Sequence, residues 1–440
     1  MRDMRRNGLM SYSPFISELI KKLDAKEGDT LSVRNGEREY VGTLMPHHEF
    51  SLEDIIILKL SNGYNIGIRI SESSSVTLVS KGAAKEKKPR PEQHSSGKTV
   101  SVLGTGGTIA SYVDYRTGAV HPALSAGDLV AAVPEIKDIC DVKAEVLFSI
   151  FSENMNVENW QTIAEEAADR INAGAEGCII PHGTDTMGYT SAALAFMLGD
   201  LPKPVVLVGA QRSSDRPSSD AYTNLVSAAR FIVNTDASEV FVLMHASSSD
   251  SSAAVHRGTK VRKMHTSRRD AFKSVNSPVV ATVDFEGGID FHADYRKKSS
   301  SKVCAQTEME TNVALLQYFP GMSPSVFSRI LHESSGVVIS GTGLGHVSSD
   351  MAEEIKSAVQ GGTSVVMTSQ CLYGRTNLNV YNTGRDLISA GVIPGEDMLP
   401  ETAYVKLMWV LAQTSDADKI SEMMRTNLRG EISDRRDISE

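Results

Sequence analysis

The sequence predicts an α/β protein with two domains built on parallel sheets that helices cover on both faces, preceded by a small β-barrel. After residue 98, short apolar runs of strand character alternate with helix-like amphipathic stretches. Before residue 80, two Asn-Gly pairs each separate strand-like runs. Between these regions lies the segment 81–98, which is rich in Lys, Pro, Gly and Ser. It has too few apolar side chains to order itself, so we expect a linker.

The N-terminal module, residues 1–80, combines one short helix with two hairpins. Apolar side chains recur at helical spacing from Phe15 to Leu23, which predicts an amphipathic helix. Asn35-Gly36 and Asn62-Gly63 are strong type I′ hairpin signals, because both central residues of that turn need φ > 0. Two tight hairpins in so short a stretch predict a small barrel. Such barrels often bind partners or RNA, and a passive structural appendage is an equally good interpretation.

Six apolar runs define the sheets that we expect after the linker. In the stretch 159–174, Trp160, Ile163 and Ile171 share one face with two alanines, which predicts a helix that ends at Gly174. A long polar stretch separates the first four runs from the last two and indicates two domains. The runs are 99–104, 178–181, 205–209, 240–244, 336–340 and 364–368. The expected domains are 99–295 and 313–425, with a connecting segment at 296–312 and a charged tail at 426–440.

Composition excludes several classes of protein. With 22% charged and 6% aromatic residues, the chain has an ordinary globular balance and is not largely disordered. The 45 Lys and Arg against 54 Asp and Glu give a net charge of −9, which excludes binding of nucleic acid by bulk positive charge alone. No apolar stretch is long enough for a membrane span and no signal peptide is recognisable, so we expect a cytoplasmic protein.

The four cysteines, Cys140, Cys178, Cys304 and Cys371, form no CxxC pair. A cysteine zinc site or a disulfide framework is therefore not expected. We interpret all four as small buried hydrophobic residues in a reducing compartment.

Chemistry-bearing residues follow the first strand. In open α/β sheets, ligands bind at the carboxyl ends of the strands. Thr105 comes after the run 99–104 and is followed by Gly106-Gly107, which lets the backbone turn sharply and approach a ligand. A GxGxxG dinucleotide loop is excluded because Ile109 occupies the position of its third glycine. A P-loop over residues 92–99, before the strand, is excluded because Glu92 occupies the position of its first glycine. A Gly-Gly turn is by itself more often structural than functional.

A second threonine follows the run 178–181, in the sequence His182-Gly183-Thr184-Asp185. A catalytic threonine needs a base or a charge relay, because its hydroxyl is a poor nucleophile. Asp185 and a lysine of lowered pKa could provide that relay, although Asp185 alone would be interpreted as a helix N-cap or a turn residue. The cation-rich segment 256–276 could supply the lysine, while most such charge runs are solvated faces.

These three elements together resemble the bacterial-type L-asparaginase/glutaminase family. The resemblance rests on TGGTIAS (105–111), HGTDTM (182–187) and the segment from Lys263 to FKSVN (272–276). It covers residues 98–425 and extends through AVPEIKDI, FSENM, KPVVLVGAQR and GVVISGTGLGH. The family fold implies two α/β domains with parallel or mixed sheets and covering helices. GDTLSVRNGEREYVGTLMP in the N-terminal module extends the resemblance to the D-subunit family of archaeal glutamyl-tRNA(Gln) amidotransferases.

The resemblance implies a site and a reaction. The catalytic residues of the family match Thr105, Thr184, Asp185 and Lys263, and its substrate-binding residues match Ser152, Glu153 and Tyr115, with Tyr112 as an alternative to the last. Plain asparaginases usually have Gln at the position of Glu153. The implied reaction hydrolyses the side-chain amide of L-glutamine or L-asparagine through an acyl-threonine. Which threonine attacks first stays open, as does the substrate preference, because NLNVYNTG (377–384) lacks the carboxylate that a second copy of the chain supplies in asparaginases.

The resemblance also implies partners. Ammonia would pass to the E-subunit of the amidotransferase, which binds Glu-tRNA(Gln) and activates it with ATP and Mg²⁺, in an ATP-dependent ligase of protein biosynthesis. We expect no cofactor and no metal in this chain, and a homodimer within a heterotetramer. Rival interpretations are a free-standing L-asparaginase, a non-catalytic binding protein on the same scaffold, and an RNA-binding protein with a vestigial α/β part. The last two require the catalytic side chains to be replaced, whereas all four match.

Overall fold

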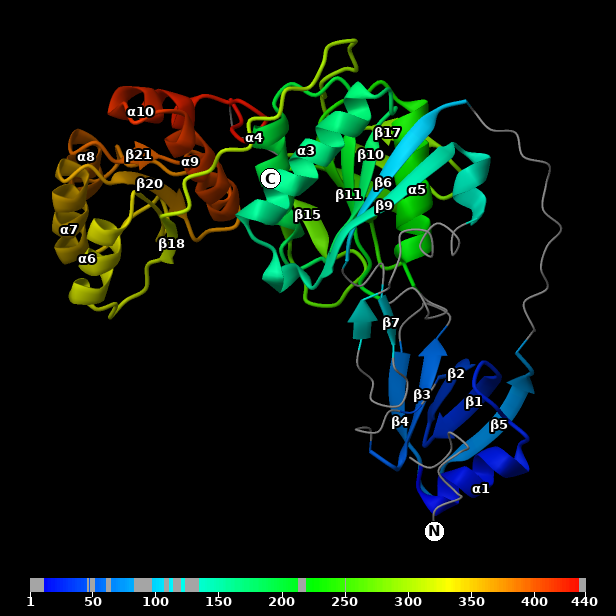
Figure 1. Ribbon diagram of the computed structural model, residues 1–440. Helices are drawn as coiled ribbons and strands as arrows, with labels where there is room; N and C mark the ends of the chain where they lie inside the picture. Colours follow the sequence, from blue (N-terminus) through cyan, green and yellow to red (C-terminus); the bar gives the residue numbers. More distant parts are fainter. Residues whose placement is uncertain are drawn as a thin grey trace. The chain divides into compact units, whose positions relative to one another are not determined.

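The computed structural model describes residues 12–45, 47, 52–60, 65–82, 97–106, 111–113, 120–122, 134–212, 219–249 and 251–434 (Figure 1). The chain divides into two compact units: the first contains the N-terminal module and the second contains both α/β domains. A two-stranded sheet of β7 (Ser111–Val113) and β8 (Val120–Pro122) also belongs largely to the first unit.

The N-terminal module is a five-stranded antiparallel sheet in the order β4-β3-β2-β1-β5, with one helix packed on it. The predicted helix is confirmed as α1 (Pro14–Lys22), whose buried Ile16 and Ile20 join the core of the module. Within the described residues no pairing between β4 and β5 closes the sheet into a barrel. The strands are β1 (Thr30–Asn35), β2 (Arg38–Leu44), β3 (Ile55–Leu60), β4 (Asn65–Arg69) and β5 (Ser75–Ser80).

The first hairpin turn differs by one residue from the prediction. Asn35 pairs with Arg38, so the two-residue loop is Gly36-Glu37. Gly36 has φ +62° and Glu37 has no positive φ, which suits a type II′ turn with glycine at its first central position. The second predicted turn, Asn62-Gly63, lies outside the described residues, as do residues 83–96 of the predicted linker. The first two linker residues are anchored, because Gly82 N donates to buried Asp29 Oδ1 at 2.7 Å.

The first α/β domain is built on an eight-stranded mixed sheet in the order β17-β16-β13-β12-β11-β10-β6-β9. The strands from β12 to β9 are parallel, and the other three are antiparallel. Helices α3 and α4 lie on one side of the sheet and α5 on the other (Figure 1). The elements are β6 (Thr99–Gly106), η3 (Pro134–Asp138), β9 (Asp141–Ile150), α3 (Val157–Asn172), β10 (Cys178–Pro181), α4 (Met187–Leu198), β11 (Val205–Val208), α5 (Ala221–Asn234), β12 (Val240–His245), β13 (Ser252–Arg257), β16 (Ala281–Asp284) and β17 (Ile289–Phe291).

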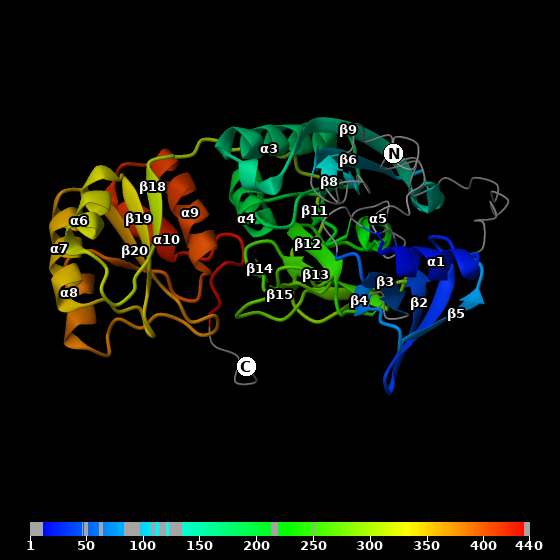
Figure 2. The ribbon, with the colours of Figure 1, turned by 90° about the horizontal axis from the view of Figure 1, so that it is seen from below.

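The second α/β domain has a four-stranded parallel sheet in the order β18-β19-β20-β21. In Figure 2, helices α6, α7 and α8 lie on one side of this sheet, and α9 and α10 lie on the other. The elements are β18 (Val313–Gln317), α6 (Pro324–Glu333), β19 (Gly336–Gly341), α7 (Ser349–Gln360), β20 (Ser364–Ser369), α8 (Asn382–Ser389), β21 (Ile393–Pro394), α9 (Pro400–Gln413) and α10 (Ala417–Arg425).

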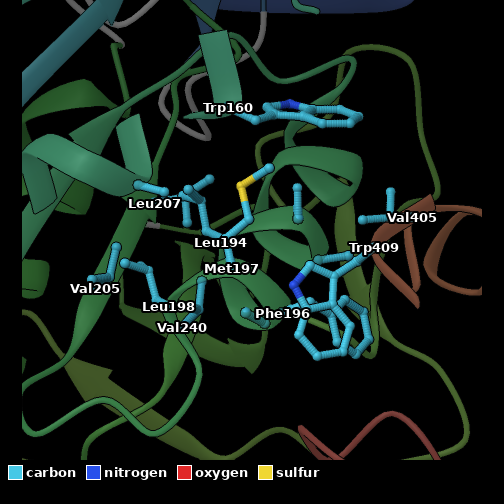
Figure 3. Packing of buried hydrophobic residues seen from close by; sticks show 14 of the residues in the cluster. Trp160, Leu194, Phe196, Met197, Leu198, Val205, Leu207, Val240, Val405 and Trp409 are labelled. Atoms are coloured by element: carbon cyan, nitrogen blue, oxygen red, sulfur yellow. The ribbon is translucent and has the colours of Figure 1, made fainter. Parts of the chain in front are cut away.

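The two α/β domains share one hydrophobic core. It contains the apolar faces of α3 and α4 together with Val405 and Trp409 of α9 (Figure 3). The rings of Phe196 and Trp409 stack with centroids 6.1 Å apart. Burial of this kind contributes about 25 cal/mol per Å² of apolar surface, so the shared core joins the domains strongly.

The predicted fold class is confirmed, and the six apolar runs correspond to β6, β10, β11, β12, β19 and β20. Periodicity did not predict β9, because this edge strand is mostly exposed and lacks a continuous apolar run. The prediction for the cysteines is wrong in half of the cases. Cys140 and Cys178 are buried, whereas Cys304 and Cys371 are exposed in irregular segments.

Candidate active site

Thr105 lies near the end of β6, where pairing with β9 becomes irregular. Gly104 is opposite Val146, but Gly106 is opposite Ile150, so the register shifts at Thr105. Such irregularities re-aim side chains and occur often beside active sites. Gly106 has φ +102°, and a Cβ there would lie 2.5 Å from Ile150 O, so only glycine fits. The Thr105 side chain is buried, and its Oγ1 donates to Pro181 O on neighbouring β10 at 2.8 Å.

The second threonine belongs to an assembled three-residue relay. Lys263 Nζ donates to Thr184 Oγ1 at 2.8 Å and to Asp185 Oδ1 at 2.7 Å. Thr184 and Asp185 are in the loop between β10 and α4, and Thr186 is the N-cap of that helix. Asp185 is therefore not the N-cap, and its carboxylate pairs with the lysine. Thr184 is buried, whereas the Asp185 side chain is mostly exposed.

Lys263 is placed by a short hairpin. It is the last residue of β14 (Val261–Lys263), which pairs antiparallel with β15 (Phe272–Ser274), and Lys263 is opposite Phe272. Phe272 and Val261 are buried in the core shared by the two domains. The apolar residues thus hold the hairpin while the lysine extends to the end of β10. The inward-pointing lysine expected in the segment 256–276 is found at Lys263.

His182 supports the loop between β10 and α4 through hydrogen bonds of its buried ring. Its Nδ1 lies 2.6 Å from Gly183 O, its Nε2 lies 2.9 Å from Thr190 Oγ1, and Trp160 Nε1 donates to the same hydroxyl at 2.9 Å. A carbonyl only accepts, so Nδ1 carries the proton; Nε2 then accepts from Thr190, which in turn accepts from Trp160. Burial lowers the pKa of His182 to about 4, which agrees with this neutral ring. The motif HGTDTM contains His182, but the sequence alone does not indicate this supporting role.

Ser152 and Glu153 are in a short 3-10 helix, η4 (Ser152–Asn154). Ser152 is buried, and its carbonyl accepts from Thr186 Oγ1 at 2.7 Å, which joins this segment to the Thr184 loop. Glu153 is exposed. The structure thus brings Ser152 beside the relay and leaves the carboxylate of Glu153 open to solvent. Tyr115 lies outside the described residues, and Tyr112 is in β7, of whose side chains nothing is described.

The cations beside Lys263 differ in their surroundings. The charge run in the sequence predicts that Arg262, Arg268 and Arg269 are solvated. Arg268 pairs with Asp270 at 2.8 Å, and Arg262 approaches Glu401 of α9 at 3.4 Å. The prediction is wrong for Arg269, which is buried and donates to Ser248 O. A charge run in the sequence does not reveal which of its members turns inward.

The arrangement suits amide hydrolysis. A buried hydroxyl and a hydroxyl–ammonium–carboxylate relay lie at the carboxyl ends of two adjacent parallel strands, β6 and β10. Such a set can supply a nucleophile and move protons without a bound metal among its members.

Three family models match the chain. Residues 99–297 match "Asparaginase, N-terminal", and residues 312–424 match "Glutaminase/Asparaginase C-terminal domain". Residues 25–79 match "GatD N-terminal domain".

Relatives match over nearly the whole chain. The D-subunit of glutamyl-tRNA(Gln) amidotransferase from Pyrococcus furiosus is 53% identical over 95% of this chain and 97% of its own length. The chain belongs to the D-subunit family of glutamyl-tRNA(Gln) amidotransferases. The member from Sulfolobus acidocaldarius is 47% identical over 94% of this chain and 93% of its own length. The resemblance inferred from the motifs is thereby confirmed.

Solved structures similar to this member of the family include asparaginases. The thermostable L-asparaginase from Thermococcus kodakarensis has a TM-score of 0.70 and 33% identity, covering 77% of this chain and all of its own. The probable cytoplasmic L-asparaginase from Campylobacter jejuni has a TM-score of 0.64 and 30% identity, with 75% and 100% coverage. Within the described part of the chain, no helix is long and apolar enough to cross a membrane.

Proposed function

We propose that the chain is the amidase component of a tRNA-dependent amidotransferase that converts Glu-tRNA(Gln) to Gln-tRNA(Gln). It hydrolyses the side-chain amide of L-glutamine or L-asparagine and supplies the ammonia. The observation that carries this proposal is the relay of Thr184, Lys263 and Asp185 beside the strand that bears Thr105. The match of residues 25–79 to the GatD N-terminal domain favours the amidotransferase over a free-standing asparaginase.

In the first step, Thr105 Oγ1 attacks the amide carbon of the substrate. The hydroxyl proton leaves through the relay and the amide nitrogen is protonated, so that ammonia departs and an acyl-threonine ester remains. Water then attacks the ester carbon, which yields the acid and restores the threonine hydroxyl. In the resting structure Thr105 donates to Pro181 O, so its hydroxyl has to rotate away from that carbonyl before it transfers a proton.

The relay provides the proton acceptor for this chemistry. Lys263 donates to both Thr184 and Asp185, and transfer of one proton to the carboxylate leaves an amine that can accept from a hydroxyl. Backbone N–H groups of the two Gly-Thr turns stabilise the oxyanion, at about 3–4 kcal/mol per donor in comparable acyl-transfer sites. Ser152 and Glu153 hold the amino-acid end of the substrate, and the family resemblance assigns Tyr115 to substrate binding as well.

The acceptor reaction belongs to a partner. The E-subunit of the amidotransferase binds Glu-tRNA(Gln) and activates its carboxyl group with ATP and Mg²⁺, and the ammonia made here completes the amide. The net charge of −9 fits this division, because most phosphate contacts are then made by the partner. We infer a cytoplasmic assembly in which a homodimer of this chain joins two copies of the partner.

The test measures ammonia release from glutamine and from asparagine by the purified chain, alone and with the E-subunit and Glu-tRNA(Gln). We expect low activity alone and a large rise when both are added. Full activity alone that is unchanged by the additions would instead identify a free-standing asparaginase. Thr105→Val and Thr184→Val should each abolish release, and Thr223→Val, a threonine at the start of α5 outside the relay, serves as the matched control.

A further inference from the structure

The segment that carries Lys263 is bound on both sides by the second α/β domain. This lysine hairpin, residues 258–276, contains β14 and β15 and belongs to the first domain by sequence. Its hydrogen bonds and ion pairs to α9 and to the segment before α9 cross the boundary between the domains, and it also bonds to Arg429 and Ser433 of the C-terminal tail.

The central contact is a buried ion pair. Lys260 Nζ lies 2.6 Å from Asp397 Oδ2, with side chains that are 1% and 7% exposed. The other carboxylate oxygen, Oδ1, accepts from Ser433 N at 3.0 Å. Both carboxylate oxygens of Asp397 are therefore bound, and its partner Lys260 is three residues before Lys263 in the sequence.

Further contacts fix both ends of the hairpin. At its start, Thr402 Oγ1 donates to Thr259 O at 2.9 Å. At its end, Asn276 Nδ2 donates to Asp397 O at 3.0 Å and to Gly374 O at 2.9 Å, while Asn276 Oδ1 accepts from Gly374 N at 2.8 Å. Asp397 thus contacts both ends of the hairpin: its side chain pairs with Lys260, which precedes β14, and its carbonyl accepts from Asn276, which follows β15.

A buried ion pair is a poor device for stability alone, because well-packed apolar residues are often as stabilising in its place. It does fix one geometry, since each charge loses its partner when the hairpin shifts. A displacement of about 1 Å in a reacting group can cost roughly a hundredfold in rate. The pair therefore suits a role in setting where Lys263 stands.

We propose that Lys260 and Asp397 are positioning residues, through which the second domain holds Lys263 against Thr184 and Asp185. This inference rests on the proposed function, because it assigns Lys263 to the relay. Neither residue touches the reacting atoms. The three residues of the relay come from the first domain. Their geometry then depends on a contact with the second domain.

The experiment compares two buried lysines. Lys260→Met should lower kcat for amide hydrolysis about tenfold, with KM within twofold of wild type, and should change the pH profile of kcat. Lys406→Met is the matched control: Lys406 and its partner Glu431 are both fully buried, but Lys406 touches no residue of the hairpin in any described hydrogen bond. It should lose comparable thermal stability and keep its kcat at temperatures where it is folded.

A double variant separates the effect on the position of Lys263 from the effect on thermal stability. Lys260→Met with Asp397→Leu removes both charges, so thermal stability should return toward wild type while kcat stays about tenfold low. Recovery of kcat together with stability would overturn the proposal, and so would equal losses of kcat in Lys260→Met and Lys406→Met.

A second measurement does not depend on catalysis. Amide hydrogen exchange should rise in peptides from 258–276 in Lys260→Met and stay at the wild-type level there in Lys406→Met. Unchanged exchange in that hairpin would refute the positioning role even if the wild type hydrolysed neither amide. An inactive wild type, tested with partner and tRNA, would count against the proposed function instead.

Discussion

Lys263 and Asp185 form an asymmetric ion pair: Nζ lies 2.7 Å from Oδ1, but the lysine side chain is 13% exposed and the aspartate side chain is 69% exposed. An exposed carboxylate is well hydrated, so the pair contributes at most about 1 kcal/mol to stability. The same exposure leaves the Asp185 carboxylate open to solvent, as the proton transfer proposed for the relay requires. The pair is thus better suited to proton transfer than to holding the fold together.

The first prediction concerns what Lys263 does in the relay. Lys263→Arg keeps a positive charge but cannot give up a proton, because the guanidinium stays protonated throughout the pH range in which proteins are folded. If Lys263 moves protons, Lys263→Arg and Lys263→Met should both lower kcat by at least about a hundredfold with little change in Tm. Ammonia release at saturating substrate measures this. Lys273→Met, a nearby lysine that pairs with Asp270, is the control and should retain activity. Near-normal kcat in Lys263→Arg would reduce the lysine to an electrostatic role.

The second prediction concerns the packing of Gly209 against Thr184. A Cβ on Gly209, just after β11, would lie 2.7 Å from both Thr184 Cγ2 and Met187 Cε. Gly209→Ala should therefore push Thr184 out of place, lower kcat by about tenfold or more, and cost about 1–3 kcal/mol of stability. Gly177→Ala is the control: it is equally crowded, against Pro204 O at 2.7 Å, but lies before β10 at the amino end of the sheet. Steady-state kinetics and urea unfolding of both variants separate the two effects, and equal kcat losses would contradict the assignment.

The fold followed from apolar runs because burial on both faces of a parallel sheet leaves a local signature. The candidate site could be predicted from the sequence only in part. Thr105 and Thr184 could be predicted from their places after β6 and β10, whereas Lys263 is 79 residues from Thr184 and required the family resemblance. Lys260 and Asp397 are 137 residues apart, and neither residue type nor spacing indicates that they meet. Long-range ion pairs of this kind depend on how two domains pack, which no local pattern encodes.

The third prediction tests the hydrogen-bond chain from Trp160 through Thr190 to His182. Thr190→Val leaves two buried groups, Trp160 Nε1 and His182 Nε2, without the partner that both now share. It should cost about 2–4 kcal/mol in the free energy of unfolding, and Trp160→Phe about 1 kcal/mol. Because the two changes remove the same bond, the double variant should be less destabilised than the sum by about 1 kcal/mol. Urea unfolding of the four proteins gives this coupling energy, and strict additivity would mean that the chain does not act as a unit.

The fourth prediction is a loss of stability in mild acid. Burial lowers the pKa of His182 to about 4 and that of His256 to about 3, against about 6.5 in the unfolded chain. Well above pH 6.5 both rings are neutral in both states. Between about pH 6.5 and 4 the unfolded state binds protons that the folded state does not, so stability falls as the pH falls, by up to roughly 1.4 kcal/mol per pH unit for each histidine.

Urea unfolding between pH 7.5 and 4.5 measures that slope. His256→Gln should flatten it by the contribution of one histidine, because glutamine does not titrate. His292→Gln is the control: His292 is exposed beside Thr282, so its replacement should leave the slope as it is. A slope in His256→Gln that equals the wild-type slope would show that His256 already takes up its proton in the folded protein, which its burial opposes.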